Sequence, residues 1–389
     1  MTKQLSKDTI AVLKNFAKKA QIEEGFETIR YVFREIFRNQ PIGTKGLAKR
    51  VCMPIPVVAA LRKELEKAGY LGRTHKGAEL TEKGQIFVKN ELKLSYKETL
   101  ICKRCNGMGF ELPPESSKLF PKQNAFAKKR PHPLTTIDQA YGKPITAMRR
   151  AYYLLENADV ENRSILLLGD DDFTSTAISL LQLDASIVVV DIDERLLQLL
   201  DEIAEDNGFP IKCYQVDLRE ELPEHLVEQF DVVLTDPPYT LEGLQLFLSR
   251  AIQGLKKEPG KRLYLSFAHR PSNELLEIQK IINHAGLAIK EIIPKFNLYE
   301  GAEMHANTTF MMQLETTKKT KPLISKSFTK NIYTGEQTPT KREYKCSNGH
   351  VILVGKSCSI KTIEELKEKG CPICGQKEKF VLISREKIQ

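Results

Sequence analysis

Apolar, strand-like runs alternate with helical segments through the middle of the chain. The runs are Ile165–Leu168, Ser186–Val190, Ile211–Tyr214, Asp231–Leu234, Arg262–Phe267 and Met311–Leu314. Continuous apolar strands separated by helices are typical of a parallel sheet that is covered on both faces. We therefore expect an α/β fold with a doubly wound, Rossmann-like sheet over residues 137–316. In such sheets ligands bind at the carboxyl ends of the strands.

A carboxylate follows each of the first four runs. The candidate cofactor-binding residues at these strand ends are Gly169, Asp170, Asp171, Asp191, Asp193 and Asp217. A carboxylate after the second strand can bind both hydroxyls of a ribose, and one after the third can accept a hydrogen bond from an adenine amine. Any single Asp after a strand is also ordinary turn chemistry. The repetition at successive strand ends favours an adenosyl cofactor.

The composition of the first loop restricts which adenosyl cofactor fits. Gly169–Asp172 has neither the repeated glycines nor the Lys or Arg that cradle phosphates. Its three carboxylates suit a sulfonium and a protonated amine, and they would repel the carboxylate of S-adenosylmethionine. The loop therefore favours decarboxylated S-adenosylmethionine as co-substrate, and aminopropyl transfer over methyl transfer.

A second motif ends the fourth run. It reads Asp236–Pro237–Pro238–Tyr239, in which the prolines stiffen the turn so that Tyr239 can wall the aminopropyl arm and Pro237 can border the cofactor. We expect Asp172 and Asp236 to lie on either side of an attacking amine, Asp172 as orienter or proton acceptor. The predicted catalytic residues are Asp172, Asp236 and Tyr239.

Further candidates lie outside the strand ends. Asp138 and Gln139 precede a predicted helix and can face the ligand, Asp138 toward the substrate and Gln139 toward the cofactor, although Asp138 can equally cap the helix. Glu300 and Glu303 are candidates for binding the distal amines of the substrate. The other interpretation of these two glutamates is a solvated loop.

These motifs resemble those of a known family. Gly169–Asp172 followed by Thr174–Ser175, together with Asp236–Tyr239 and Asp138–Gln139, is similar to the branched-chain polyamine synthases, N(4)-bis(aminopropyl)spermidine synthase. The resemblance spans roughly residues 20–310 and implies a methyltransferase-type Rossmann fold. It also implies transfer of aminopropyl groups from decarboxylated S-adenosylmethionine to the secondary amine of spermidine, with release of methylthioadenosine.

Two other functions share parts of this pattern. Asp-Pro-Pro-Tyr also marks S-adenosylmethionine-dependent methyltransferases that act on amines or adenines in nucleic acid, and a regulator that senses these ligands through an inactive domain is a third interpretation. Charge separates them: residues 160–310 have a net charge of −13, whereas residues 1–100 have +9 and residues 311–389 have +8. An acidic catalytic region attracts polyamines and repels phosphates. We therefore do not expect nucleic acid at the active site.

The N-terminal part is predicted to form a separate module. Residues 1–100 have the pattern of helices followed by two short strands, which resembles a winged helix, and such a module either contacts DNA or serves packing and dimerisation. Residues 101–136 follow as a turn and linker in which Cys102 and Cys105 are either half of a metal site, to which Cys52 or another chain could add a ligand, or a free thiol pair. A homodimer is the expected assembly.

The C-terminal part contains a second cysteine pattern. Residues 317–341 are rich in Lys, Thr and Ser and are predicted to be a linker, and residues 342–389 are predicted to form a small zinc ribbon. The expected zinc ligands are Cys346, His350, Cys371 and Cys374, with Cys358 as the alternative fourth ligand. The chain shows no apolar run of membrane-spanning length and no targeting segment, so a cytoplasmic location without membrane contact is expected.

Overall fold

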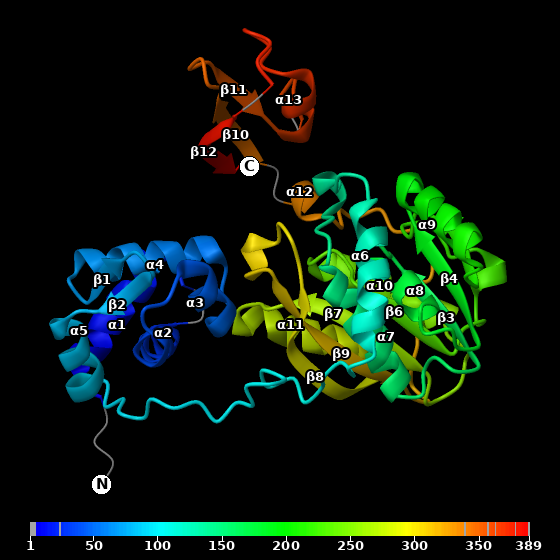
Figure 1. The fold of residues 1–389 in the computed structure, drawn as a ribbon, viewed down its shortest axis with the longest axis horizontal. Coiled ribbons are helices and arrows are strands. Elements are labelled where there is room, and N and C mark those ends of the chain that lie inside the picture. The colour runs from blue at the N-terminus through cyan, green and yellow to red at the C-terminus, as the bar shows by residue number, and fades with distance from the viewer. Residues whose placement is uncertain are drawn as a thin grey trace.

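The computed structural model describes residues 5–22, 25–337, 340–355, 358–361, 363–377 and 379–387. Figure 1 shows a helical module at the N-terminus, a central α/β domain and a small module at the C-terminus. Within these described ranges, no helix has the length and apolarity needed to cross a bilayer.

The N-terminal module packs its helices around a cluster of aromatic rings. It contains α1 (Lys7–Lys19), α2 (Phe26–Asn39), α3 (Thr44–Val51), α4 (Ile55–Lys67), β1 (Leu71–Thr74), β2 (Gly77–Leu80), α5 (Glu82–Ile86) and a π-helical turn at Phe87–Glu91. The rings of Phe33, Tyr70 and Phe87 meet in its core. β1 and β2 pair as an antiparallel hairpin. The helices and hairpin follow the predicted order, and the winged-helix assignment and its role stay predictions.

The central domain is built on a seven-stranded sheet. Its strands are β3 (Arg163–Leu168), β4 (Ala185–Asp191), β5 (Ile211–Gln215), β6 (Val232–Thr235), β7 (Arg262–Ala268), β8 (Leu287–Leu298) and β9 (Thr308–Thr316), in the spatial order β5-β4-β3-β6-β7-β9-β8. The strands from β5 to β7 in this order run parallel, whereas β9 is antiparallel to both β7 and β8. The predicted α/β fold with a doubly wound sheet is confirmed, and the predicted parallel order fails at this edge, where β9 is antiparallel and the unpredicted strand β8 pairs with it.

Helices cover both faces of this sheet. The helices are α7 (Pro144–Glu156), α8 (Thr174–Ser179), α9 (Glu194–Asn207), α10 (Leu241–Gly254) and α11 (Ser272–His284), with 3-10 turns at Thr135–Ile137, Glu224–Leu226 and Glu303–His305. Alternate residues of β3 enter opposite cores, because side chains of a strand point alternately to its two faces. Ile165 packs with α7, α8 and α9, while Leu166 packs with α10 and α11. Because the first four strands run parallel, their carboxyl ends lie at the same edge of the sheet, between the two layers of helices.

Two segments that the sequence predicted to be linkers pack against the central domain. Helix α6 (Ser116–Lys128) lies within residues 101–136, and its fully buried Gln123 donates a hydrogen bond to the carbonyl of Phe173 at 2.9 Å. Residues 317–337, here called the strap, cross α10 and end in α12 (Thr334–Gln337). The buried Arg250 guanidinium of α10 donates to the strap carbonyl of Lys326 at 2.8 Å. Side chains of the central domain or of the segment itself hold these segments through backbone carbonyls. Such contacts leave no apolar pattern in the sequence, so sequence analysis does not detect them.

The C-terminal module is a small antiparallel sheet with one helix. Its elements are β10 (Thr340–Lys345), β11 (Val351–Val354), α13 (Ile363–Lys369) and β12 (Val381–Lys387), and the strand order is β11-β10-β12. Tyr344, Ile352, Val354, Ile360 and Leu366 form its apolar core together with Cys346 and Cys371. A core of this size depends on further crosslinking for stability.

Candidate active site

The first aspartate of the loop after β3 caps a helix. Asp170 accepts hydrogen bonds from the backbone N–H groups of Thr174 at 2.6 Å and Ser175 at 3.0 Å, at the start of α8. Burial raises the pKa of Asp170 to about 7 against the opposing effect of these hydrogen bonds. The sequence predicted that Asp170 binds the cofactor, and the structure places it in the helix cap below the cavity surface.

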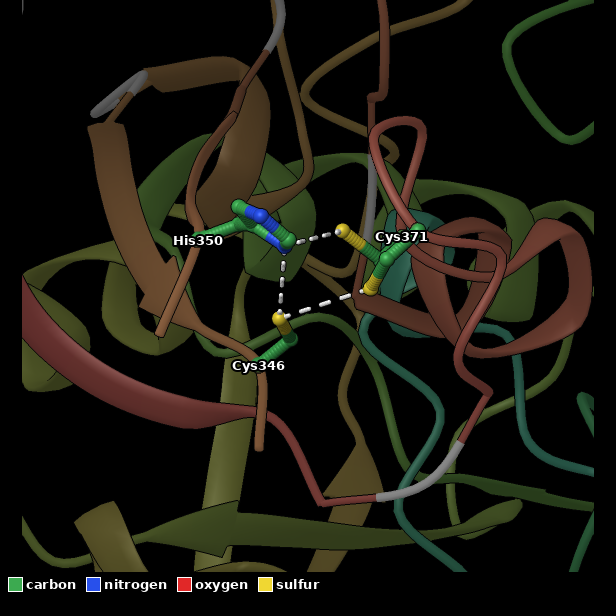
Figure 2. Close-up of side chains that lie close together, drawn as sticks. Cys346, His350 and Cys371 are labelled. Carbon is green, nitrogen blue, oxygen red and sulfur yellow. Dashed lines mark hydrogen bonds between the residues drawn. The ribbon is translucent and has the colours of Figure 1, made fainter. Parts of the chain in front are cut away.

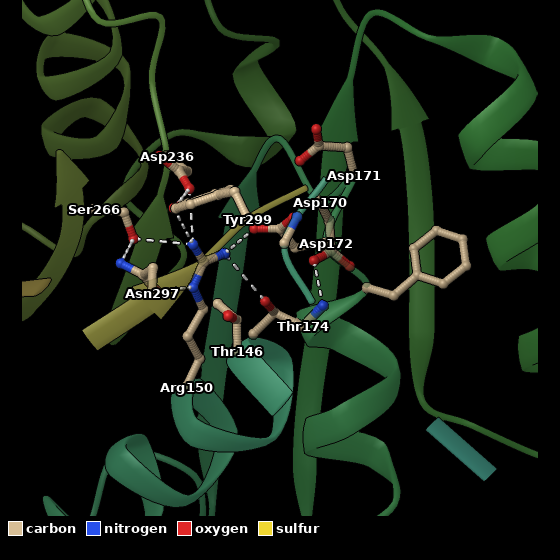
Figure 3. A network of polar contacts seen from close by, with 12 residues as sticks. Thr146, Arg150, Asp170, Asp171, Asp172, Thr174, Asp236, Ser266, Asn297 and Tyr299 are labelled. Carbon is tan, nitrogen blue, oxygen red and sulfur yellow. Dashed lines mark hydrogen bonds and ion pairs between the residues drawn. The ribbon is translucent and has the colours of Figure 1, made fainter. Parts of the chain in front are cut away.

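A buried arginine connects two predicted catalytic residues. The Arg150 guanidinium lies 2.8 Å from Asp172 Oδ2 through Nη1 and 2.7 Å from Asp236 Oδ2 through Nη2. Figure 3 shows these carboxylates around the guanidinium, with Asp171 pointing away from it. The Asp172 side chain is 2% exposed, and its second oxygen accepts from the N–H of Gly142. A Cβ at Gly142 would lie 2.6 Å from that oxygen, so this close approach needs a glycine.

Two tyrosines complete the environment of Asp236. The Tyr239 hydroxyl donates to Asp236 Oδ1 at 2.9 Å, and the Tyr299 hydroxyl donates to Oδ2. The pKa of Asp236 is raised overall. Burial and the nearby Asp172 raise it, and the Arg150 guanidinium opposes them. Burial and the nearby Asp236 raise the pKa values of both tyrosines well above their ordinary range, so both remain neutral donors.

A cavity of about 800 Å³ opens at these strand ends. The acidic side chains that line it are Asp138, Asp171, Asp191, Asp217, Asp236, Glu303 and Glu336. Gly169, Gln139, Pro237, Tyr239 and Tyr299 complete much of the wall, and Arg342 and Lys361 of the C-terminal module contribute basic groups. This volume falls within the range of small-molecule pockets. The cavity therefore suits a cationic ligand of nucleoside size.

Asp171 is the aspartate of the first loop that lines this cavity. Burial raises its pKa well above the ordinary value, with further increases from Asp172, Asp191 and Asp236. Arg130 opposes this rise, and its guanidinium stacks 4.4 Å from the Tyr141 ring while donating to the Asp171 carbonyl at 3.0 Å. A carboxylate with a raised pKa gains from a neighbouring cation, so this position favours binding of a protonated amine.

The carboxylates after β4 and β5 have unequal surroundings. Asp191 lines the cavity and accepts from the N–H of Asp193 at 2.9 Å. Asp193 is buried below the cavity wall, where it pairs with Arg195 at 2.7 Å and accepts from the Gln139 amide at 3.1 Å. Asp217 lines the cavity and also pairs with Arg219 at 2.8 Å. Among the described residues, the backbone N–H groups of Asp170 and Asp193 orient the Asp191 carboxylate.

The remaining predicted residues separate into two groups. Asp138, Gln139, Gly169, Pro237 and Glu303 line the cavity, as predicted for ligand-binding residues, whereas Glu300 is exposed and lies outside the lining. The Asp138 carboxylate accepts from the backbone N–H of Thr334 at 2.7 Å, so it holds the strap. Burial raises the pKa of Asp138 against this hydrogen bond. The ligand contacts proposed for all of these residues stay predictions.

Sequence reasoning missed several residues that shape the site. These are Arg130, Arg150, Tyr333 and Glu336. Arg150 lies three residues after Ala147 and one before Ala151 on the predicted apolar face of α7, and a cation on such a face signals a buried carboxylate partner. Tyr333 and Glu336 lie in the strap, where the sequence pattern gives no such signal.

A second candidate site lies in the C-terminal module. Ligand atoms of Cys346, His350, Cys371 and Cys374 all lie within 4.8 Å of one another. Cys346 Sγ is 3.5 Å from His350 Nδ1, and both lie beside Cys371 (Figure 2). Cys346 Sγ is also 3.9 Å from Cys374 Sγ. These separations fit a tetrahedral ion with metal–ligand distances of about 2.0–2.3 Å. The cluster agrees with the predicted ligand set, in which Cys358 was the alternative.

Comparisons with known proteins agree with this architecture. The family described as branched-chain polyamine synthase A C-terminal domain matches residues 118–356. An uncharacterised protein from Methanocaldococcus jannaschii is 45% identical over 379 residues, which cover 97% of this chain and 94% of that protein. N(4)-bis(aminopropyl)spermidine synthase from Thermococcus kodakarensis is 34% identical over 250 residues, which cover 63% of this chain and 70% of that enzyme.

A solved structure shows the same fold. The branched-chain polyamine synthase from Thermus thermophilus, in complex with N4-aminopropylspermidine and 5'-methylthioadenosine, superposes with a TM-score of 0.68 at 23% identity. The match covers 85% of this chain and 99% of that one. The family match and the Thermococcus relative lead to one conclusion. The chain belongs to the branched-chain polyamine synthase family.

Proposed function

We propose that the protein transfers aminopropyl groups from decarboxylated S-adenosylmethionine to the secondary amine of spermidine, forming branched polyamines and methylthioadenosine. The observation that carries this proposal is the cavity at the strand ends, whose wall includes Asp171, Asp191, Asp217 and Asp236. Relatives named as N(4)-bis(aminopropyl)spermidine synthase support it, as does a related structure that holds a branched polyamine and 5'-methylthioadenosine.

In the proposed reaction, the neutral secondary amine attacks the methylene carbon next to the sulfonium. The nitrogen lone pair forms the new C–N bond while the C–S bond breaks, and its electrons neutralise the sulfur as methylthioadenosine leaves. The new ammonium then loses a proton to a carboxylate or to solvent. The protein's contribution is to align nitrogen, carbon and sulfur and to hold the cationic ends of the polyamine.

Residue roles follow from the cavity wall. Asp171 contacts the substrate amine, and Asp236, oriented by Arg150 and Tyr239, lies across from it. Direct contact of Asp172 with the attacking nitrogen stays a prediction, because its carboxylate faces Arg150 in this structure. We assign Asp172 the role of fixing the Arg150 guanidinium and, through it, Asp236.

The adenosyl part binds on the other side of the first loop. Asp191 accepts from the ribose hydroxyls, and Asp217 accepts from the adenine amine. Gln139 borders the same region and is held through its hydrogen bond to Asp193. Glu303 and Asp138 extend the acidic wall toward the distal amines. A cytoplasmic enzyme acting as a homodimer is consistent with this role, and both properties are part of the proposal.

The C-terminal cluster holds a structural zinc in this proposal. Cys346, His350, Cys371 and Cys374 provide the donor set and spacing of a closed tetrahedral site. Zinc bound there would crosslink the turn between β10 and β11 to the Cys-Pro-Ile-Cys turn after α13. The module places Arg342 and Lys361 at the cavity wall, so its folding affects the shape of the site.

The test is a direct assay. Purified protein is incubated with decarboxylated S-adenosylmethionine and spermidine, and mass spectrometry follows methylthioadenosine and tertiary or quaternary amine products. A parallel reaction contains S-adenosylmethionine and an oligonucleotide. We expect branched polyamine in the first reaction and no methylated nucleotide in the second. Methyl transfer without branched product would favour the methyltransferase alternative, for which the basic flanking modules are the main argument.

A further inference from the structure

A cysteine-containing turn lies outside both sites described above. Residues 102–109, here called the knuckle turn, belong to the extended connection between the N-terminal module and α6, which runs along the outside of the molecule in cyan (Figure 1). Cys102 is exposed and Cys105 is partly exposed, and both are free thiols. The backbone turns sharply here, with positive φ of 52° at Asn106, 82° at Gly107 and 70° at Gly109.

A backbone hydrogen bond closes this turn. The N–H of Met108 donates to the carbonyl of Cys105 at 3.1 Å. The thiolate is the form of cysteine that binds metals, and Cys-x-x-Cys followed by glycine is a metal-binding knuckle.

The knuckle turn supplies only half of a tetrahedral site. A structural thiolate site needs four ligands. Among the residues that the structure describes, the group that brings together three or more metal-binding side chains is the C-terminal cluster of Cys346, His350, Cys371 and Cys374, and neither Cys102 nor Cys105 is part of it. Within the part of the chain that the structure describes, the knuckle turn is therefore an incomplete site, and a second chain can supply the remaining ligands.

The surroundings of the knuckle turn point to a second copy of the chain. Large apolar side chains next to it face solvent: Leu100 is 89% exposed, Ile101 53% and Tyr96 52%. On its other side Phe110 packs against Tyr153 and Phe296, which fixes the turn to the catalytic domain. Exposed apolar groups beside a rigid half-site suit an isologous contact, in which the partner brings the same ligands and covers the same side chains.

We propose that two copies of the chain share one tetrathiolate metal site formed by Cys102 and Cys105 of each copy, with Tyr96, Leu100 and Ile101 buried around it. Zinc is the expected metal, and iron is the other ion that takes four thiolates in this geometry. The site is separate from the C-terminal cluster and does not depend on the proposed catalytic function. It accounts for a cysteine pair that neither candidate site uses.

Metal stoichiometry tests this proposal. Zinc and iron per chain are measured by plasma mass spectrometry in the intact protein and in Cys102→Ser and Cys105→Ser. One metal per two chains predicts that each variant loses about half a metal ion per chain. Cys52→Ser, which changes a cysteine outside the knuckle turn, is expected to retain the full content. No loss would contradict a metal at this turn, and loss of a whole ion per chain would contradict sharing.

Assembly provides the second readout. In native mass spectrometry we expect the dimer of the knuckle variants to hold one metal ion fewer than the dimer of the intact protein. In sedimentation, the dimer of the variants should dissociate at a higher protein concentration than the dimer of the intact protein. Binding of methylthioadenosine, measured in parallel, reports that the variants are folded. A dimer released by thiol reductants but not by chelators would indicate a disulfide and overturn the metal site.

Discussion

At the residue scale, the central feature of the active site is a cation inside an acidic environment. Arg150 is fully buried, and its charge neutralises Asp172 and Asp236 from below the cavity. Burial alone would lower the pKa of Arg150. This effect is outweighed by Asp172, Tyr299 and Asp236, which raise the pKa, so the guanidinium stays charged. Its presence allows several carboxylates to remain close together before a cationic substrate arrives.

Replacing this arginine should destabilise the catalytic domain. Arg150→Met leaves Asp172 and Asp236 buried without their counter-charge, a defect of about 3–5 kcal/mol. The midpoint of thermal unfolding should fall, and it should fall more at pH 8 than at pH 5. Without Arg150 the pKa of Asp236 rises further, so protonation relieves the repulsion in acid. Arg149→Met is the matched control, since among the described residues Arg149 donates to the Phe296 carbonyl and pairs with neither Asp172 nor Asp236. Equal losses in the two variants would argue against this role.

Asp171 should show the opposite effect on stability. Burial and its acidic neighbours raise its pKa in the folded protein, so its ionised form opposes folding above that pKa. The loss of folding free energy develops as the pH rises from the pKa of Asp171 in the unfolded chain to its pKa in the folded protein. Below the pKa of the unfolded chain the loss is absent. Asp171→Asn should therefore raise the unfolding midpoint at pH 8 and leave it unchanged near pH 3.5.

The same substitution should impair function. Without the Asp171 carboxylate, spermidine turnover should fall by about 10²-fold or more, while methylthioadenosine binding is retained. Calorimetry with methylthioadenosine and product assays with spermidine measure the two effects separately. A variant that is both less stable and fully active would exclude Asp171 from the proposed role.

At the scale of elements, the sequence predicts the strands that are apolar on both faces and fails where other forces dominate. Ile165–Leu168 and its successors were identified because buried parallel strands are continuously apolar. β8 was missed because Lys290, Glu291, Pro294 and Lys295 interrupt its apolar pattern at the sheet edge. The sequence also predicted the position of the carboxylates, because the topology places them at the strand ends. It could not predict which Asp faces the cavity, because that depends on contacts with Arg150 and α8.

The strap should contribute to substrate binding. Ile332 and Tyr333 pack against Leu246 of α10, and residues from Ile332 to Glu336 form part of the cavity wall. Tyr333→Ala removes the ring that holds this wall, so the KM for decarboxylated S-adenosylmethionine should rise by about 10-fold, equal to about 1.4 kcal/mol. Tyr333→Phe keeps the ring and should behave nearly as the intact enzyme. Steady-state kinetics of both variants decide the point, and an unchanged KM in Tyr333→Ala would show that the strap does not shape the site.

The C-terminal module should depend on its metal. Cys371→Ser removes a buried ligand of the cluster, and we expect loss of about one zinc ion per chain together with unfolding of residues 342–389. Metal analysis and limited proteolysis measure these effects. Cys358→Ser is the control, because Cys358 lies outside the cluster and its replacement should leave zinc bound. Retention of zinc in Cys371→Ser would remove Cys371 from the ligand set.

At the scale of the whole molecule, charge is segregated rather than balanced. The chain has a net charge of +9, yet residues 160–310 have −13 and surround a cavity with acidic walls. Basic modules on either side keep the overall charge positive, and the two basic groups that they bring to the cavity wall, Arg342 and Lys361, are outnumbered there by seven acidic side chains. Such a field raises the local concentration of polycations at the site and disfavours a phosphate backbone there.

This segregation predicts an unequal response to salt. Raising the ionic strength from about 0.05 M to about 0.5 M shortens the Debye length from well above 10 Å to below it, which screens the attraction between the acidic cavity and a polycation. The KM for spermidine should rise severalfold. The affinity for methylthioadenosine should change little, because the nucleoside is uncharged and binds through hydrogen bonds and packing. Kinetic assays and calorimetry across the same salt series compare the two ligands directly. Parallel weakening of both ligands would mean that salt alters the cavity itself, and a spermidine KM insensitive to salt would mean that local contacts alone, not the field of the acidic region, select the substrate.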